Sequence, residues 1–286
     1  MLLHMHCRCR DVMRAGAPGR RGCRVVIFAL VLWIMPLWIM PLCAQPSLRV
    51  QVSGAVAHPG VLQVPVGARL ADVTSAAQVD NTAYVLGAAW LRPELQRAQL
   101  RLKAGLLYEL QVIALQARVQ QHAGLQMLAQ RLHAQLAAMP LTGRQVVTTL
   151  EPHALQIDDA ANLPLQAGDQ LFYPWRPRTI RVLGAVAHDC RLAQVPLRDA
   201  RDYLQACPRA ASADADLLYV IQPDGHVFEQ GVALWNRSAP LALAPGAVLY
   251  VPLRRDWIAP AADDRFNAEM ARFLATQILP ATESTP

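Results

Sequence analysis

Two arginines flank a long helical segment, and they are the residues best suited to hold a ligand. Arg92 precedes the segment and Arg144 follows it. A planar guanidinium can donate two parallel hydrogen bonds to a carboxylate or to neighbouring hydroxyls. Because the aromatic residues Tyr84 and Trp90 lie near Arg92 in the chain, the pattern predicts a site for an acidic or hydroxyl-rich sugar. The alternative is that the arginines only tie the helical segment to its domain.

No catalytic or cofactor motif accompanies these arginines. After residue 44 the chain has no nucleophile elbow, no His-Glu-x-x-His zinc motif, no Walker loop and no dinucleotide-binding glycine pattern. Its histidines also lack the spacing of metal ligands. We therefore predict a protein that is not an enzyme, with no catalytic residue, no metal and no cofactor. Scattered carboxylates leave open the alternative of a carbohydrate-active enzyme with an unrecognised pair of acids.

Cys190 and Cys207 are the only cysteines after residue 44, and we predict that they form a disulfide. The prediction depends on export to an oxidising compartment, where such bonds persist. Closing this short loop would add about 3 kcal/mol of stability by loop entropy. Two buried free thiols are the alternative, whereas a catalytic thiol is disfavoured because no histidine partner arrangement is evident.

The first 44 residues have the parts of a secretory signal. A basic stretch precedes the apolar run 25–42, and Cys43-Ala44 forms a processing site. We predict cleavage after Ala44 and a periplasmic mature protein. The alternative is a retained inner-membrane anchor, because a run of this length is at the lower limit for crossing a bilayer.

This leader also carries most of the excess positive charge. The whole chain has a formal net charge of +6, but six arginines and one acid lie within residues 1–44. The remainder is therefore nearly neutral, at about +1. Without a basic patch interleaved with aromatic residues, the composition argues against nucleic-acid binding.

An internal repeat organises the rest of the chain. The pentapeptide Gly-Ala-Val-Ala-His occurs at residues 54–58 and again at 184–188, and each copy follows a run of strand-like alternation. A second echo relates residues 165–174 to residues 243–252. Two copies this long predict two homologous globular domains rather than a solenoid. We place these domains at 45–176 and 177–258.

Two helical features lie outside the repeat. Residues 93–139 are rich in Leu, Ala, Gln and Arg with apolar residues at helical spacing, so we predict a helical hairpin inserted into the first domain, with its turn at His122-Ala123-Gly124. The C-terminal region 259–286 contains an amphipathic run at 263–279. We predict a helix there that docks onto the protein or a partner, with self-association as one outcome.

Several motifs together carry a resemblance to a known family. They are V-x-V-x-G-x-V-x-x-P-G at 50–60, A-Y-x-x-G-A-x-x-x-R at 83–92, T-G-R at 142–144 and L-x-x-G-D-x-L-x-x-P at 165–174. The first and last resemble the soluble-ligand-binding β-grasp modules of polysaccharide-export proteins. The order of all the parts resembles the GfcC-like capsule biosynthesis family.

This resemblance implies an α+β fold with two tandem β-grasp domains, a helical hairpin in the first, and a C-terminal amphipathic helix. It also implies a periplasmic, non-enzymatic accessory protein of capsule or exopolysaccharide assembly and export, related in architecture to Wza-type exporters. The expected partners are polysaccharide or export-machinery proteins at the outer membrane, and no nucleic acid. The second repeat departs from the pattern at Asp189-Cys190 and Ala247, which favours ligand binding by the first domain.

Overall fold

A computed structural model describes residues 46–280. The predicted signal peptide and its processing site lie outside the described residues. Within the described range, no helix combines the length and the apolar character needed to cross a membrane.

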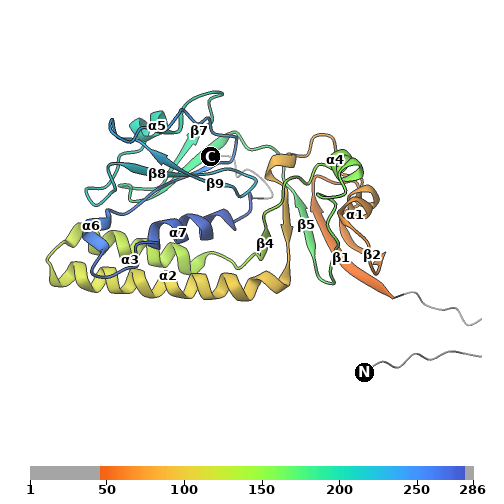
Figure 1. The fold of residues 1–286 in the computed structure, drawn as a ribbon, viewed down its shortest axis with the longest axis horizontal. Coiled ribbons are helices and arrows are strands. Elements are labelled where there is room, and N and C mark those ends of the chain that lie inside the picture. The colour runs from red at the N-terminus through yellow and green to blue at the C-terminus, as the bar shows by residue number, and fades with distance from the viewer. Residues whose placement is uncertain (1–45, 281–286) are drawn as a thin grey trace, which may run out of the picture. The chain divides into compact units, whose positions relative to one another are not determined.

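The first sheet has the strand order β2-β1-β5-β3-β4 (Figure 1). The hairpin strands β1 (Ser47–Gly54) and β2 (Gly60–Pro65) are antiparallel, and β5 (Gln170–Tyr173) runs parallel to β1. On its other side, β5 pairs with the antiparallel strand β3 (Ala89–Leu91), which is followed at the edge by β4 (Arg144–Gln145). The sheet is therefore mixed, with its one parallel pair at the centre.

The second sheet repeats this order as β7-β6-β10-β8-β9. Its hairpin strands are β6 (Thr179–Gly184) and β7 (Cys190–Ala193), and β10 (Val248–Val251) runs parallel to β6. The antiparallel strands β8 (Leu217–Ile221) and β9 (Val227–Gly231) complete it. The predicted α+β class with two related halves is thus present as two five-stranded sheets with the same topology.

The loops of the two halves also correspond. Isolated bridges recur at equivalent positions, so the duplication extends beyond the strands. The pairs are Val56↔Val79 with Val186↔Arg209, Arg69↔Pro164 with Asp199↔Ala242, and Ala83↔Trp175 with Ala213↔Leu253.

The glycine of the repeated pentapeptide is required by a close approach of two strands. Gly54 has a φ of +93°, and a Cβ there would lie 2.0 Å from the carbonyl oxygen of Tyr173. Gly184 has a φ of +102°, and its Cβ would lie 2.3 Å from the carbonyl oxygen of Val251. Only glycine allows both this backbone conformation and this contact.

The first half has its own apolar core. The helices α1 (Leu70–Ala77) and α4 (Pro152–Ile157) contribute to it together with the sheet. In β1, Val50 and Val52 are buried whereas the alternate residues face outward, as the period of a half-buried strand predicts. The largest buried members of this core are Trp90, Tyr173, Leu70, Leu155 and Leu171.

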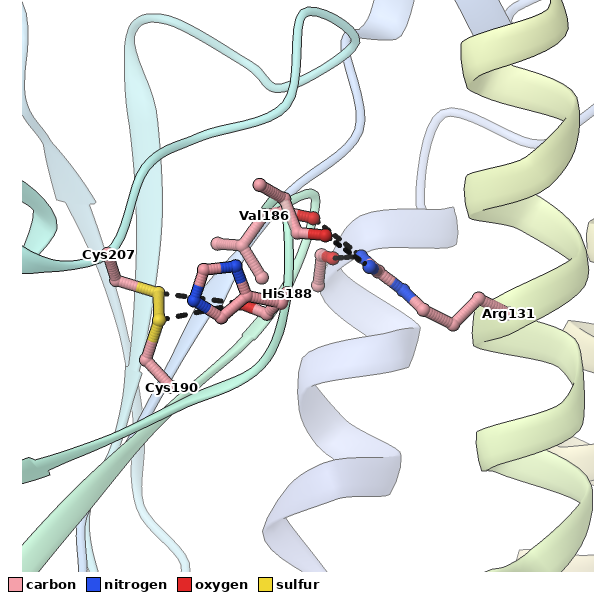
Figure 2. The surroundings of a disulfide bond; sticks show 7 residues. Arg131, Val186, His188, Cys190 and Cys207 are labelled. Atoms are coloured by element: carbon pink, nitrogen blue, oxygen red, sulfur yellow. Dashed lines mark hydrogen bonds between the residues drawn. A yellow bond between two sulfur atoms is a disulfide. The ribbon is translucent and has the colours of Figure 1, made fainter.

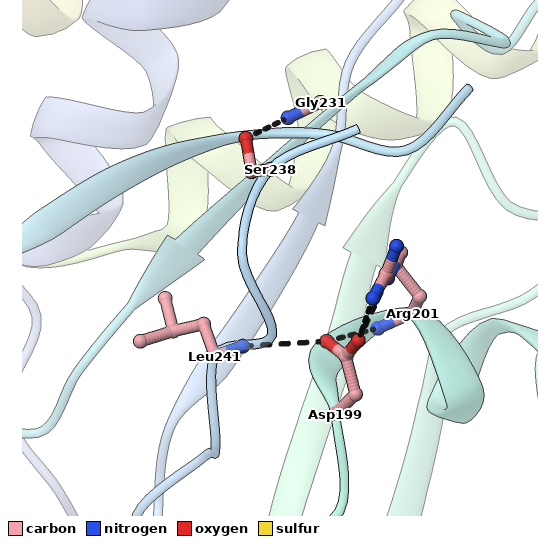
Figure 3. A network of polar contacts seen from close by, with 5 residues as sticks. All are labelled: Asp199, Arg201, Gly231, Ser238 and Leu241. Carbon is pink, nitrogen blue, oxygen red and sulfur yellow. Dashed lines mark hydrogen bonds and ion pairs between the residues drawn. The ribbon is translucent and has the colours of Figure 1, made fainter. Parts of the chain in front are cut away.

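The second half has short helices, α5 (Ala200–Tyr203) and η2 (Leu204–Ala206), where the first has α1. Asp199 caps α5 and links it to the strand-connecting loop, because its carboxylate accepts from the backbone and side chain of Arg201 and from the amide of Leu241 (Figure 3). Nearby, the Ser238 hydroxyl accepts from the amide of Gly231 at 2.9 Å.

Two long helices connect β3 to β4, where the second sheet has only the turn 223–225 between β8 and β9. They are α2 (Pro93–Val119) and α3 (Ala123–Ala138). Proline suits the start of α2, because the amide of a residue in the first turn has no acceptor within the helix. Gln121 adopts a left-handed φ of +59°, and the amide of His122 bonds the carbonyl of Ala117. This Schellman motif ends α2 at Gln120.

The predicted turn position at His122-Ala123-Gly124 is therefore wrong by about two residues. We chose it because of Gly124, but α3 already begins at Ala123 and Gly124 lies within its first turn. A glutamine, not the glycine, takes the left-handed conformation.

The apolar faces of α2 and α3 belong to the core of the second half, although their chain is inserted in the first. They pack with the second sheet and with α7 (Phe266–Ala275), which lies along α2 (Figure 1). The buried residues of the two helices are Leu106, Leu110, Ile113, Ala117, Leu125, Leu128, Ala129, Leu132 and Leu136. The apolar face of α7 is covered in this way within the chain, so self-association would need another surface.

Polar contacts fasten α3 to the second copy of the pentapeptide. The Arg131 guanidinium donates to the carbonyls of Val186 at 2.5 Å and Ala187 at 2.7 Å (Figure 2). One turn later, the Gln135 amide donates to the Asp189 carboxylate at 2.9 Å. Strand ends and turns of the second half are thus tied to the inserted helices.

A disulfide lies directly behind this contact. Cys190 and Cys207 are bonded with their Cα atoms 6.0 Å apart, and the carbonyl oxygen of His188 lies 3.4 Å from Cys190 Sγ (Figure 2). The bond joins the start of β7 to the end of η2.

Replacing both cysteines with alanine should lower the free energy of unfolding by about 3 kcal/mol, because a closed loop of this size restricts the unfolded chain by roughly that amount. The two cysteines are 17 residues apart. Urea denaturation of the oxidised protein and the double variant measures the difference. The reduced wild-type protein is the control and should resemble the variant; equal midpoints for all three would contradict the prediction.

Candidate ligand-binding cleft at Arg144

Arg144 is buried where the two halves of the chain meet. Its side chain donates from Nη1 to the carbonyls of Ala275 and Gln277, at 3.3 and 3.2 Å. From Nη2 it donates to the carbonyls of Ala88 and Pro223, at 3.3 and 2.5 Å. One guanidinium thus joins the first sheet, the β8–β9 turn and the segment that follows α7.

The residues before Arg144 explain how the chain holds it there. Gly143 has a φ of +68°, and a Cβ at this position would lie 2.2 Å from the carbonyl oxygen of Arg92. Its amide donates to the Gln99 side chain at 2.7 Å. The Thr142 hydroxyl donates to the carbonyl of Thr276 at 2.7 Å. The Thr-Gly-Arg motif therefore fixes the strand edge to both α2 and the C-terminal segment.

The charge of Arg144 is stabilised by dipoles and by one acid. Burial lowers the pKa of Arg144 to about 10, and the nearby Asp224 acts in the opposite direction. The group therefore remains protonated at neutral pH. Asp224 also faces the imidazole of His226, with Nδ1 3.2 Å from Oδ2.

A cleft of about 150 Å³ lies beside this junction. Its polar lining consists of Gln145, Thr148, Thr149 and Asp224, and its apolar lining comes from residues around Leu86. Hydroxyl, amide and carboxylate groups of this kind can exchange hydrogen bonds with the hydroxyls of a sugar. The cleft is small, so it suits one sugar unit rather than a long segment of polymer.

The structure brings Tyr84 to the same region as Arg144. Burial raises the pKa of Tyr84 to about 12, Arg176 acts against this, and Asp224 raises it further. The guanidinium of Arg176 lies over the Tyr84 ring, 5.6 Å from its centroid.

Arg92 and Trp90 serve a different part of the molecule. Trp90 is 0% exposed within the core of the first half, and Arg92 lies over its ring at 4.6 Å. Arg92 also pairs with Glu94 at 2.7 Å and approaches Asp169 at 3.7 Å. Because a fully buried ring has no face for a sugar, burial argues against the predicted ligand role of Trp90.

The two arginines therefore do not converge on one ligand. Arg144 extends toward the second half, whereas Arg92 covers Trp90. The contacts of Arg144 are structural, but they join the first sheet to the second half and do not tie the helical segment to its domain. The sequence did not predict Asp224, Thr148 or Thr149 as site residues. Asp224 belongs to the Pro-Asp-Gly sequence at 223–225, which indicates only a turn, and the two threonines belong to no recognisable motif.

Comparison with known proteins gives two adjoining family matches. Residues 47–176 match the family described as "Capsule biosynthesis GfcC, N-terminal", and residues 190–279 match "Capsule biosynthesis GfcC C-terminal". The first match covers the first sheet and the inserted helices. The second covers most of the second sheet and α7.

A curated relative is similar over part of the chain. "Uncharacterized protein YjbG" of Escherichia coli (strain K12) is 29% identical over 147 residues, which are 51% of this chain and 59% of YjbG. The chain thus spans less than two thirds of that relative's length. The two matches, in the expected order and over both sheets, show that the chain belongs to the GfcC capsule biosynthesis family.

Proposed function

We propose that the protein is a periplasmic, non-enzymatic accessory protein of capsule or exopolysaccharide assembly and export. Family membership supports the capsule-related role. The observation that carries the accessory role is the Arg144 junction, where one buried cation ties two related sheets and the C-terminal segment together. Such a junction suits a fixed two-module platform for polysaccharide or an export-machinery protein.

The finer fold assignment is part of the same proposal. A hairpin, a helix and a central parallel strand pair in the order β2-β1-β5-β3-β4 support two β-grasp modules of the soluble-ligand-binding type. The cleft beside Arg144 would then be a place where one module meets a sugar. The basic and apolar leader supports export to the periplasm, with removal after Ala44.

Deleting the gene tests this function. We expect the amount or the chain length of surface polysaccharide to fall, and a plasmid copy of the wild-type gene to restore it. Unchanged polysaccharide in the deletion strain would exclude the proposed role.

A second measurement separates this role from that of a carbohydrate-active enzyme. The purified protein should leave the chain length of isolated capsular polysaccharide unchanged during long incubation, as followed by size-exclusion chromatography. Shortening or modification of the polymer would support the enzyme instead.

A further inference from the structure

The outer face of the inserted helices is apolar and exposed. Figure 1 shows α2 at the lower edge of the described part of the chain, with α3 and α7 above it. One stripe along α2 consists of large apolar residues that are 52% to 78% exposed: Leu100, Tyr108, Leu115 and Val119. Met127 on α3 is also exposed. Exposed apolar side chains that gather on one surface are typical of a site that packs against a partner.

A groove of about 370 Å³ lies between α2 and α3 on this face. Leu110, which is buried, and Leu115, which is exposed, both line it, so the groove has an apolar base and an apolar rim. Gln130 and His133 of α3 line the opposite side. A hydrophobic groove between two helices is a surface into which the apolar face of a third helix can pack.

The two acids of the inserted helices are already engaged. Residues 93–139 contain Glu94 and Glu109 as their only acids. Glu94 pairs with Arg92 at 2.7 Å at the start of α2. Glu109 accepts from the amide of Asp263 at 3.1 Å, and this contact directs it toward the C-terminal region. Within these two helices, no other carboxylate is present to balance the cations beside the groove.

Three arginines of α2 are left without an acidic partner. Arg97, Arg101 and Arg118 are exposed, and none of them forms an ion pair among the residues that the structure describes. Arg101 follows Leu100 and Arg118 precedes Val119, so positive charge lies at both ends of the apolar stripe. Charges beside an apolar helical stripe determine which helix can pair with it. This arrangement attracts an acidic partner and repels a basic one.

A second copy of this chain would bring like charges together. In an antiparallel pair of α2 helices centred between Tyr108 and Gln111, Arg101 would lie opposite Arg118 of the other copy. In a parallel pair, each arginine would lie opposite its own equivalent. Because like charges at facing helix positions are destabilising, the stripe favours a different protein over self-association.

The polar residues of the groove argue against a membrane surface. Gln111 and Gln130 both line it, and Gln111 Nε2 lies 3.3 Å from His133 Nε2. Amide groups that enter hydrocarbon lose their hydrogen bonds with water, which is costly. The side chains of a partner helix can supply replacement donors and acceptors.

We propose that the groove between α2 and α3 binds an amphipathic helix of another protein, in which acidic residues flank the apolar stripe. The apolar residues of this helix pack on Tyr108 and Leu115, and its carboxylates pair with Arg101 and Arg118. The groove is separate from the cleft beside Arg144, and it does not rest on the capsule-related role.

Fluorescence anisotropy with two designed peptides tests the groove on the purified protein. Each labelled peptide has about three heptads with leucine at positions a and d, and positions e and g carry glutamate in one peptide and lysine in the other. We expect the glutamate peptide to bind about tenfold more tightly than the lysine peptide, because only its charges complement the arginines. Its binding should weaken as the salt concentration increases.

Substitutions on α2 separate the apolar contribution from the charged one. Leu115→Asp should weaken binding of the glutamate peptide about tenfold or more, because a buried leucine contact is lost and a like charge is added. The double variant Arg101→Glu, Arg118→Glu should prefer the lysine peptide, a reversal that a merely structural role would not produce. Leu234→Asp is the matched control, since Leu234 is 86% exposed outside these helices and should not affect binding. Unfolding midpoints show whether each variant is folded.

Crosslinking in cells identifies the natural occupant of the groove. Tyr108→p-benzoylphenylalanine should, on illumination, attach to a second protein, and mass spectrometry should place the attachment in an amphipathic sequence rich in Asp and Glu. Leu115→Asp should abolish this product. The same photoreactive residue in place of the exposed Trp235 is the control and should not yield it.

Several results would overturn the groove as a helix-binding site. They are equal binding of both peptides by the wild type, equal affinity in wild type and Leu115→Asp, or no crosslink that depends on Leu115. A crosslink to a second copy of this chain would show self-association instead. Binding to phosphatidylglycerol vesicles that Leu115→Asp abolishes, without binding of either peptide, would show a membrane surface. Normal polysaccharide in the deletion strain would exclude the capsule role and leave the groove standing.

Discussion

Replacing Arg144 with alanine should lower the free energy of unfolding by about 3 kcal/mol or more, because several buried carbonyl oxygens would lose a charged hydrogen-bond donor. Arg144 is 8% exposed, and its guanidinium donates to four carbonyls from three separate segments. Alanine would leave these oxygens buried without donors, which is the costly case for a hydrogen bond. Urea denaturation followed by tryptophan fluorescence measures the loss.

Arg144→Lys is the matched control. An ammonium keeps a cation but donates from a single point, so it cannot serve carbonyls on both sides of a planar fork. We expect a loss smaller than that of alanine but still measurable. Limited proteolysis gives a local readout: cleavage near residues 276–280 should become faster in both variants. Wild-type stability in the alanine variant would mean that water replaces the guanidinium without cost.

Replacing Phe273 with alanine should cost about 3–5 kcal/mol, the range for truncating a buried aromatic residue. Phe273 lies on the apolar face of α7, is 0% exposed, and belongs to the core shared by α2, α3 and the second sheet. Truncation would open a cavity at the point where the inserted helices meet that sheet. The same denaturation measurement applies.

Phe228→Ala is the control for this prediction. Phe228 lies on β9 and is 41% exposed, so its truncation should change stability by about 0.5 kcal/mol or less, as for most surface substitutions. If the two substitutions had equal effects, α7 would not be held by the core as described.

The repeated elements were predictable because their signal is local. The alternation of β1 and β6 has the period of a strand, and the pentapeptide glycine reports a close backbone contact within each half. The apolar run at residues 81–91 has the composition of a single strand, but only Ala89–Leu91 forms β3 and a 3₁₀ turn (Val85–Gly87) precedes it. A Cβ on Gly87 would lie 2.5 Å from Leu279. The C-terminal segment thus approaches the run at Gly87, whereas Ala89–Leu91 lies in the sheet.

The surface against which the inserted helices pack was not predictable. Periodicity identifies an apolar face but not the surface that covers it, and the covering residues are far along the chain. The same limit applies to Arg144, whose acceptors Pro223 and Ala275 are 79 and 131 positions away. The sequence therefore drew attention to Arg144 but did not indicate which groups it contacts.

Because distant parts of the chain share one core, that core cannot be completed until the second half has been synthesised. α2 and α3 occupy residues 93–138 and leave the ribosome before the sheet and the helix that cover them, which extend from Thr179 to Ala275. Until that later half is synthesised, the nine buried side chains of these helices can pack only between α2 and α3, without the sheet and helix that complete their core. Incomplete chains with exposed apolar surface are prone to aggregation. A chain that stops at residue 176 would therefore contain the whole first sheet and still lack the cover for its own inserted helices.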